Sequence, residues 1–586
     1  MFKSKNNLIF IALLTLTALF LRFYRLSDFP VSLNWDEVSH GYNAYSLLQT
    51  GKDEWGNFLP LIFRAFGDYK LPVYIYLTIF PVLIFGLNAF AVRFVSALAG
   101  TLAIPGIYLL TNSLFPDKNI TICKLRLNLG HLSALVLTFM PWHFFISRPA
   151  LEANLSLTLI IFGFFFLHRG LKDRKSLIFS SLLLGLSLHT YNTARVFVPA
   201  LLLVFIFLFR KQIKFSGSSN NSENNVIPAQ AGIYANFRLN KVMIVSSVLF
   251  LSFFALVLYQ VVSGTGTARY SKLKILTDNA VYRIGQSRLS SKLPQPLPVL
   301  IHNRPVYFAT TVLSNYLGYF SPKFLYQWQG AQTQFAIPIK NLLSLPVTIL
   351  GIVGLVYLLI KRNRSGSFIL FWLLLSPLAA SLTADPPQAL RPNPFIPSIA
   401  ILAGLGIYLL VEKSRLLFKT VVLASVTVSL ILSLHFYLVD YYGDYAHYYS
   451  DSWQYGYKQV FEFLNHNDLQ YDKVIFTKKY GEPHIFYAFY NKLNPSILQP
   501  GGDSIRFNKS DWFWTDKIGD YYFVNDWDIP YRGETINSLK LESGEIIDSH
   551  RSLLVTTFNR VPDNAKVEKI IEFVDGRVAF IIASVP

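Results

Sequence analysis

Two adjacent carboxylates, Asp36 and Glu37, lie in the segment SLNWDEVSHGYNAYSLL, shortly after the first apolar run of the chain. The aromatic residues Trp35 and Tyr42 flank them. A carboxylate in this setting could take a proton from an acceptor hydroxyl, and glycosyl transfer with inversion needs one such group opposite the leaving group. The structural alternative is the acid-rich N-terminus of a helix, where the helix dipole favours negative charge. The residues alone leave both interpretations open.

Two basic residues could bind a phosphate. Lys70 stands in FGDYKLPVYIY, at the start of an apolar run, and the alternative for it is a lysine that reaches along the membrane interface toward water. Arg391 stands in TADPPQALRPNPFIP, a short loop whose prolines fix the backbone. A guanidinium is a natural partner for a phosphate, and the alternative for Arg391 is a salt bridge to Asp385.

Two further segments combine charged and aromatic side chains. Arg148 and Glu152 share the short loop SRPALEANL, where they could simply pair, although an acid in so short a loop is also placed to face a cavity. His189 and Tyr191 lie with Arg195 in LHTYNTARVFVP. For His189 the alternative to a functional role is that of a hydrogen-bonded structural histidine.

The composition indicates a membrane protein. Of 586 residues, 52% are hydrophobic and only 15% are charged, with a mean hydropathy of +0.37, whereas soluble domains carry about 25% charged residues. The single cysteine, Cys123, excludes an internal disulfide and a cysteine-based metal cluster. The net charge of +19 is uneven, because residues 440–586 hold 15 basic and 21 acidic residues while the rest carries +25. Nucleic-acid binding is therefore not expected, since the part that could most easily reach a polyanion is acidic.

Apolar runs of roughly 17–25 residues mark membrane spans, and they predict about eleven crossings, near 7–24, 89–115, 130–146, 154–168, 177–192, 195–210, 242–262, 341–360, 367–383, 394–411 and 419–438. One further run, 71–87, decides the topology. If it lies at the outer interface and the N-terminus is inside, the basic clusters of the short loops all fall inside, as the positive-inside rule requires. These clusters are Lys118, Lys124 and Arg126; Arg169, Lys172, Arg174 and Lys175; Arg210, Lys211 and Lys214; Lys361, Arg362 and Arg364; and Lys413, Arg415 and Lys419.

This topology predicts three outer pieces: the loop 25–88, the loop 263–340 and a C-terminal domain. Acidic, basic and aromatic groups then converge on outer span ends from at least four loops. We read 8–22 as an uncleaved first span and the polar segment 215–240 as a flexible cytoplasmic insertion. Residues 440–586 alternate helix and strand signals, which indicates a small α/β domain with a hairpin around Asp575-Gly576. We therefore divide the chain into a membrane domain, 1–439, and an extracytoplasmic domain, 440–586.

The sequence over roughly 8–440 resembles the polyprenyl-phosphate-sugar-dependent glycosyltransferases of the GT-C fold, above all protein O-mannosyltransferases and the aminoarabinose transferases that modify lipid A. The resemblance rests on the order and spacing of WDEVSHGYNAYSLL, GDYKLPVYIY, FGLNAFAVRFVSALAGTLAIPGIYLL, SRPALEAN and ALRPNPFIP. It implies an α-helical polytopic membrane protein with the GT-C fold and a small soluble α/β domain. It also implies a cell-membrane location, with the N-terminus cytoplasmic and the C-terminal domain outside.

The resemblance also implies residue roles. Asp36 matches the acid thought to activate the acceptor, with Glu37 its neighbour, and Glu152 matches a second acid in the second outer loop. Lys70 matches a lysine that contacts the donor phosphate, and Arg391 looks like the basic residue of the late outer loop. Two departures are Leu71-Pro72, where the family often has Pro-Pro, and Gln388, where it often has histidine. The implied partners are a polyprenyl-phosphate sugar, an acceptor on a protein, lipid or glycan, and membrane lipid.

We therefore predict a glycosyltransferase that moves a sugar to an acceptor hydroxyl on the outer face, with catalytic residues Asp36, Glu37 and Glu152. Lys70, Arg391, Arg148, Tyr191 and His189 are the predicted substrate-binding residues. No cofactor is predicted; some GT-C enzymes use a divalent metal, and the lysine-bearing subset need not. The rival interpretations are a lipid-linked sugar flippase or transporter, which would place charges near the bilayer midplane and often show internal repeats, and a non-catalytic glycan-binding membrane protein.

Overall fold

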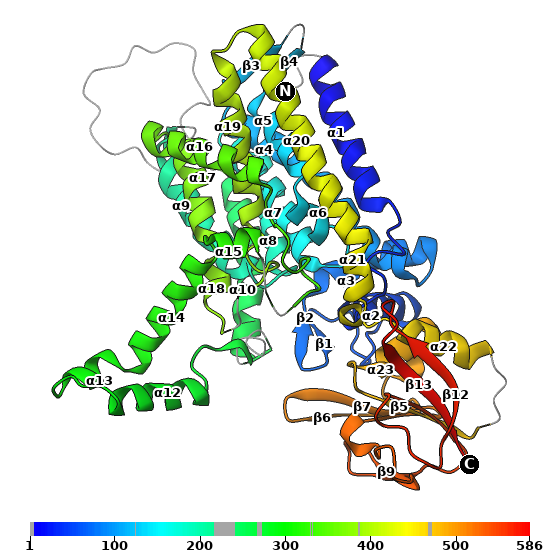
Figure 1. Ribbon diagram of the computed structural model, residues 1–586. Helices are drawn as coiled ribbons and strands as arrows, with labels where there is room; N and C mark the ends of the chain where they lie inside the picture. The colour runs from blue at the N-terminus through cyan, green and yellow to red at the C-terminus, as the bar shows by residue number, and fades with distance from the viewer. Residues whose placement is uncertain are drawn as a thin grey trace, which may run out of the picture.

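The computed structural model consists of a bundle of helices and a domain built on a β-sheet (Figure 1). The structure describes residues 5–122, 125–215, 241–265, 272–327, 330, 332–384, 387–466 and 471–586. Cys123, the insertion 216–240 and Asp385 therefore lie outside the described residues.

Each predicted span contains a helix of the bundle. These helices are α1 (Lys5–Phe23), α4 (Ala89–Leu114), α5 (Leu129–Thr138), α6 (Pro141–Ile146), α7 (Glu152–Arg169), α8 (Ser176–Leu188), α9 (Ala194–Phe215), α10 (Lys241–Val262), α16 (Leu345–Lys361), α17 (Arg364–Leu375), α18 (Leu378–Ser381), α19 (Phe395–Glu412) and α20 (Leu416–Tyr442). The run 130–146 is two helices rather than one, because Pro141 begins α6 and cannot continue α5.

The chain is a multi-pass membrane protein. Within the described residues, six helical segments are long and apolar enough to cross a bilayer, and five shorter apolar helices accompany them. A large core of buried apolar side chains fills the bundle and includes residues of α1, α4, α5, α7 and α19. The number of crossings stays a prediction.

The decisive run 71–87 forms α3 (Pro72–Phe85), a helix of 14 residues. At 1.5 Å per residue it is about 21 Å long, which is shorter than the roughly 30 Å hydrocarbon core of a bilayer. In Figure 1, α2 (Trp35–Thr50), α3 and the sheet domain lie at one end of the bundle, and the hairpin of β3 (Asn119–Ile122) and β4 (Leu125–Asn128) lies at the other. The side of the membrane that each end faces stays a prediction.

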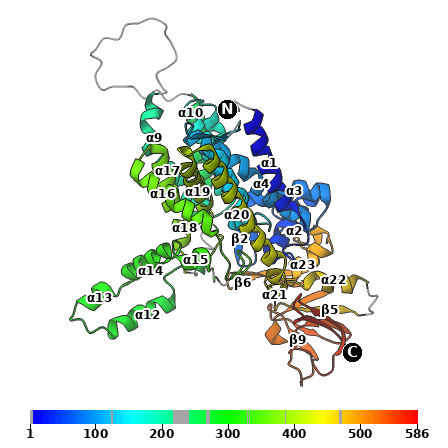
Figure 2. The same cartoon turned by 45° about the horizontal axis from the view of Figure 1, so that its top comes forward.

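The predicted outer loop 263–340 forms four helices in its described part. They are α12 (Asp278–Leu289), α13 (Leu297–Ile301), α14 (Arg304–Gly318) and α15 (Pro322–Tyr326). In both views α12, α13 and α14 project as an arm at the end of the bundle that also carries the sheet domain (Figures 1 and 2).

The C-terminal domain is built on a seven-stranded mixed sheet. Its strand order is β12-β13-β11-β5-β8-β7-β6, and β5 runs parallel to both β11 and β8. The strands are β5 (Lys473–Thr477), β6 (Ser504–Lys509), β7 (Trp512–Ile518), β8 (Tyr521–Val524), β11 (Ser552–Thr556), β12 (Lys566–Glu572) and β13 (Val578–Val585). A separate pair, β9 (Ser538–Lys540) and β10 (Ile546–Asp548), lies beside it. The predicted hairpin around Asp575-Gly576 is confirmed as β12 and β13.

The sheet domain shares its core with the first outer loop. Helices α22 (Tyr457–His466) and α23 (Pro483–Tyr490) contribute to one hydrophobic cluster together with α2, α3 and α4. At Gly41 of α2, a Cβ would lie 2.7 Å from the ring of Phe489 and 2.5 Å from Val92, so glycine permits close contact with both neighbours. The predicted boundary between 439 and 440 falls inside the last turn of α20, and the division into two domains stays a prediction.

Two glycines allow α16 and α19 to pack with their backbones in contact. A Cβ on Gly354 would collide with main-chain atoms of Leu402, and a Cβ on Gly406 with those of Leu350. Small residues at such crossings are a common device of membrane helices, because close packing replaces the hydrophobic drive that lipid does not supply.

We expect Gly354→Ala to destabilise the bundle by about 1–3 kcal/mol, because the added methyl group must separate α16 from α19. Thermal unfolding of the purified chain in detergent measures this loss. Gly351→Ala on the same helix is the matched control, since a Cβ at Gly351 meets nothing within 4 Å. Equal melting temperatures for the two variants would contradict this account of the interface.

Candidate active site

The two adjacent carboxylates stand in the first turn of α2. Asn34 caps this helix: its side chain accepts a hydrogen bond from the Glu37 N–H at 3.0 Å, and the Asn34 N–H donates to Glu37 Oε2 at 3.2 Å. This reciprocal pair is a capping box, which fixes where the helix begins. The helix start therefore holds Asp36 and Glu37 on different sides of one turn.

Glu37 faces inward and is fully occupied by protein partners. Its side chain is 1% exposed and forms a two-pronged ion pair with Arg93 of α4, with Nε–Oε1 at 2.9 Å and Nη2–Oε2 at 3.1 Å. Oε1 also accepts the Ala150 N–H at 2.9 Å. Arg93 donates its remaining bonds to the carbonyls of Leu26, Pro30 and Ser32. A carboxylate with this set of partners is positioned to order the surrounding loops.

Asp36 faces the other way and remains accessible. Its side chain is 38% exposed, and its Oδ1 lies 2.5 Å from the Nζ of Lys70, whose side chain is 8% exposed. Lys70 ends the hairpin of β1 (Phe63–Ala65) and β2 (Asp68–Lys70). The structure thus joins two residues that stand 34 positions apart in the chain.

His40, one turn after Asp36 on α2, is a residue that the sequence analysis missed. It is 1% exposed, and its ring lies 5.1 Å from that of Tyr74. Burial lowers the pKa of His40 below its usual 6.5; the Lys70 ammonium acts in the same direction, and the carboxylates of Glu152, Asp36 and Glu37 act against it. His40 thus belongs to the same helix turn region as Asp36, and its burial favours the neutral imidazole. The i, i+4 spacing from Asp36, which puts both on one helix face, is the signal that would have found it.

Glu152 opens α7, where the helix dipole favours a carboxylate. Neighbouring residues fix its backbone: Ala150 bonds Glu37, and the Ala153 carbonyl accepts from Asn393 Nδ2 at 2.7 Å. The Glu152 side chain is half-buried and makes no hydrogen bond or ion pair with the described residues. It is the second carboxylate of the cluster that surrounds His40.

Arg391 lies in the loop that Asn393 attaches to the start of α7. Its Nη1 donates to Thr383 Oγ1 at 2.6 Å, and its carbonyl accepts from Thr193 Oγ1 at 3.2 Å. The side chain is 7% exposed. The alternative partner, Asp385, lies outside the described residues. Gln388, where the resembled family often has histidine, donates to Gln332 at 2.7 Å.

Arg148 has no donor left for a substrate. Its Nε donates to Tyr441 Oη, and its four remaining N–H groups meet the carbonyls of Leu21, Arg22, Arg25 and Phe29. A pair with Glu152, one of the two alternatives left open by the sequence, is not among its bonds. Because the end of a helix leaves carbonyls without partners, Arg148 stabilises the end of α1 and the loop after it.

The other two predicted substrate-binding residues, His189 and Tyr191, also contact groups of the protein itself. His189 follows α8, and its Nε2 is 3.0 Å from the Phe253 carbonyl. Its own carbonyl accepts the Val73 N–H at 3.3 Å, which ties the start of α3 to the end of α8. Tyr191 is 7% exposed and belongs to the core of the bundle.

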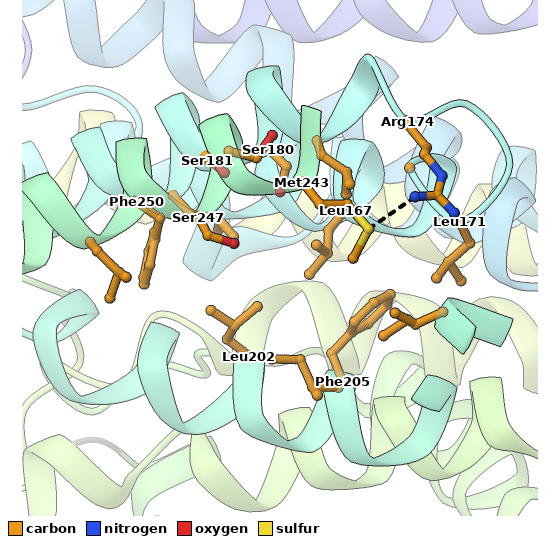
Figure 3. Close-up of a pocket in the computed structure, with 17 residues that line it drawn as sticks. Leu167, Leu171, Arg174, Ser180, Ser181, Leu202, Phe205, Met243, Ser247 and Phe250 are labelled. Atoms are coloured by element: carbon orange, nitrogen blue, oxygen red, sulfur yellow. Dashed lines mark hydrogen bonds between the residues drawn. The ribbon is translucent and has the colours of Figure 1, made fainter. Parts of the chain in front are cut away.

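An apolar pocket of about 470 Å³ lies among α7, α8, α9 and α10, well away from this cluster (Figure 3). Arg174, at one end, donates to the sulfur of Met243 at 3.0 Å. The described lining of this pocket includes no acid and no histidine, so the pocket offers no group for proton transfer. The candidate active site is instead the cluster of Asp36, Lys70, His40 and Glu152.

The comparisons with known proteins bear on this arrangement. Residues 70–218 match a family model described as dolichyl-phosphate-mannose-protein mannosyltransferase, a stretch that begins at Lys70 and includes Glu152. No curated relative matches this sequence.

Among solved structures, apo ArnT from Cupriavidus metallidurans superposes with a TM-score of 0.52 at 12% identity, over 98% of this chain and 97% of that one. ArnT bound to undecaprenyl phosphate gives a TM-score of 0.49 at 13% identity, over 83% and 84%. The apo oligosaccharyltransferase of Archaeoglobus fulgidus gives 0.49 at 13% identity; the match covers 83% of this chain but only 64% of that one, which is less than two thirds. The likeness to apo ArnT confirms the predicted fold.

We expect removal of either partner of the buried Glu37–Arg93 pair to cost about 3–5 kcal/mol, because the other charge is left buried and unpaired. Thermal unfolding of Glu37→Gln and Arg93→Met in detergent measures this cost. Lys458→Met, which breaks an exposed pair with Glu462, is the control and should change the melting temperature little. Glu37→Gln and Arg93→Met that both melt like the unaltered chain would show that the pair does not order this region.

Proposed function

We propose that this GT-C-fold membrane glycosyltransferase moves a sugar from a polyprenyl-phosphate donor to an acceptor hydroxyl, with inversion, at the outer face of the cell membrane. The observation that carries the proposal is the ion pair between the accessible carboxylate of Asp36 and the buried ammonium of Lys70, with Oδ1 and Nζ 2.5 Å apart. A base must meet the proton that it removes. Of the two adjacent acids, Asp36 meets this requirement and Glu37 does not, so we assign Glu37 a positioning role.

The proposed step needs Asp36 as a carboxylate. The acceptor O–H gives its proton to Asp36, and the acceptor oxygen attacks the anomeric carbon from the face opposite the phosphate. The bond between that carbon and the phosphate oxygen breaks, and polyprenyl phosphate leaves with the electron pair. The Lys70 ammonium stabilises the Asp36 charge before this step, and it stands where it can also meet the charge that develops on the phosphate.

The other residues of the cluster take supporting roles in this proposal. Arg391 would bind the leaving phosphate together with Lys70. Glu152, at the start of α7, would orient the acceptor or one of the catalytic groups. Neutral, buried His40 lies among these charges and would help to hold their geometry.

The donor class and the location are part of the proposal. ArnT of Cupriavidus metallidurans, whose apo form shares this fold, has been solved with undecaprenyl phosphate, which supports a polyprenyl carrier here. The short α3 and the common end of the bundle that carries α2, α3 and the sheet domain support an outer active site with the N-terminus inside.

We expect Asp36→Asn to reduce sugar transfer by about 10²- to 10⁴-fold, because an amide cannot accept the acceptor proton. In this assay the purified chain in nanodiscs is incubated with a polyprenyl-phosphate sugar and cell-envelope glycoconjugates. Mass spectrometry of the glycoconjugates then measures the sugar transferred. Asp28→Asn is the matched control, since Asp28 is an exposed acid of the same loop whose one ion-pair partner within the described part of the chain is Arg25. Transfer by Asp36→Asn at the normal rate would refute the assignment of Asp36 as the base. No transfer by the unaltered chain would instead favour a flippase or a non-catalytic binding protein.

We expect transfer to continue in the presence of a chelator, because an ammonium rather than a metal ligand faces Asp36 at 2.5 Å. Among the described residues, no group of three or more His, Cys, Asp or Glu side chains could hold a metal ion. The measurement is turnover with EDTA, before and after magnesium is added. Complete loss in EDTA with recovery in magnesium would assign a divalent metal to the reaction.

A further inference from the structure

A cleft of about 720 Å³ opens where the sheet domain meets the first outer loop. Four of the nine tryptophans of the chain line it: Trp35 just before Asp36, Trp512 and Trp514 on β7, and Trp527 after β8. Trp527 is 69% exposed, and the other three are half-buried. Aromatic faces that remain accessible in a concave site are typical of ligand-binding pockets.

The tryptophans are held in place by polar contacts. The Trp512 indole N–H donates to Glu482 Oε1 at 2.7 Å, and the Trp35 backbone N–H donates to Gln454 Oε1 at 2.7 Å. The Trp35 ring packs so closely on Gly481 that a Cβ there would lie 2.5 Å from it. The rings of Trp35 and Trp512 are therefore fixed before any ligand arrives, which lowers the entropic cost of binding.

The charges of the cleft balance. Its lining has three acids, Asp451, Glu482 and Asp526, and three bases, Lys478, Lys479 and Arg560. Protein partners neutralise the bases: Lys478 pairs with Asp516 at 2.8 Å, and Lys479 and Arg560 lie 3.5 and 4.0 Å from Asp526. No surplus of positive charge remains for a phosphate, so the cleft suits an uncharged ligand with many hydroxyl groups.

Glu482 supports the aromatic wall from inside the protein. It is 4% exposed, its Oε1 accepts the Trp512 indole N–H, and its buried Oε2 lies 3.3 Å from His484 Nδ1. The accessible polar groups of the lining are instead those of Asp451 and Lys479, whose side chains are 34% and 50% exposed. Indole rings beside such groups match the two sides of a sugar, its C–H face and its hydroxyl groups.

Both walls of the cleft continue into the candidate active site. Trp35 is the residue before Asp36, and Trp512 packs against Gly67 in the β1–β2 turn, which leads to Lys70. The Phe513 N–H also donates to the Phe66 carbonyl at 2.6 Å. The cleft therefore borders the two segments that carry Asp36 and Lys70, although neither of these side chains lines it.

We propose that this cleft is the acceptor site and that it holds uncharged sugar rings of a glycan acceptor against Trp512, Trp514 and Trp527. The inference rests on the proposed function, and it names the acceptor class that the same active site would serve: a neutral glycan hydroxyl.

The test uses the full chain in nanodiscs, with an array of neutral and acidic oligosaccharides as the probe and no donor present. We expect the chain to retain neutral oligosaccharides and Trp527→Ala to weaken this binding at least about tenfold. Trp514→Ala is a second variant, in case one ring contributes little. Phe558→Ala, which removes an exposed aromatic of the same domain outside the cleft lining, should bind normally.

In transfer to a neutral glycan that binds, Trp527→Ala should raise the acceptor KM and leave kcat nearly unchanged, because the ring binds ground state and transition state alike. Binding that survives both tryptophan variants, binding of acidic glycans only, or an array with no retained sugar would overturn the inference. Asp36→Asn separates the two proposals, because it should lose transfer and keep glycan binding. Transfer that depends on Asp36 with no retained glycan would overturn the acceptor site alone. Retained glycan with no transfer by the unaltered chain would overturn the proposed function, and transfer that does not depend on Asp36 would overturn its assignment as the base.

Discussion

The buried ion pair between Glu37 and Arg93 is the contact on which the outer end of this protein depends. It joins α2 to α4 in a place where neither charge can reach water, and both side chains must therefore find all of their partners inside the protein. Through Arg93 the pair holds the loop that leads from α1, and through the Ala150 N–H it holds the loop that leads into α7. The positions of Asp36 and Glu152 both follow from that one pair.

The same pair explains why the adjacent carboxylates Asp36 and Glu37 differ in their accessibility. Successive residues of a helix point about 100° apart, so when Glu37 turns into the protein, Asp36 must turn toward the surface beside Lys70. Accessibility then separates the carboxylate that can meet an acceptor from the one that cannot. A site built in this way gains a fixed carboxylate without relying on a mobile loop.

Much of this arrangement could be predicted from the chain. The eleven apolar runs each contain a helix, and the run 71–87 contains the 14-residue helix α3, whose failure to cross the membrane stays a prediction. The resemblance gave Asp36 and Lys70 separate roles at one outer face, and their direct contact was not predicted. The role of Arg93 was not predicted, although a lone arginine in the apolar segment AFAVRFVSAL must have a partner. Arg148 and Glu152 stand four residues apart, but tertiary contacts with the end of α1 claim the arginine, and no local pattern reports those contacts. Strands β6, β7 and β11 also escaped prediction, because their place in the sheet depends on partners distant in sequence.

The contacts between the β1–β2 turn and β7 limit how the sheet domain of such an enzyme can change during evolution. Phe66 bonds Phe513 across it, and Gly67 leaves no room for any side chain under Trp512. The sheet domain is therefore not a freely exchangeable module, even though the chain reaches it only after the last helix of the bundle. A recombined protein that received a foreign sheet domain would also need the matching hairpin from its first loop. New recognition surfaces are thus expected to arise by substitution inside the cleft more readily than by domain shuffling.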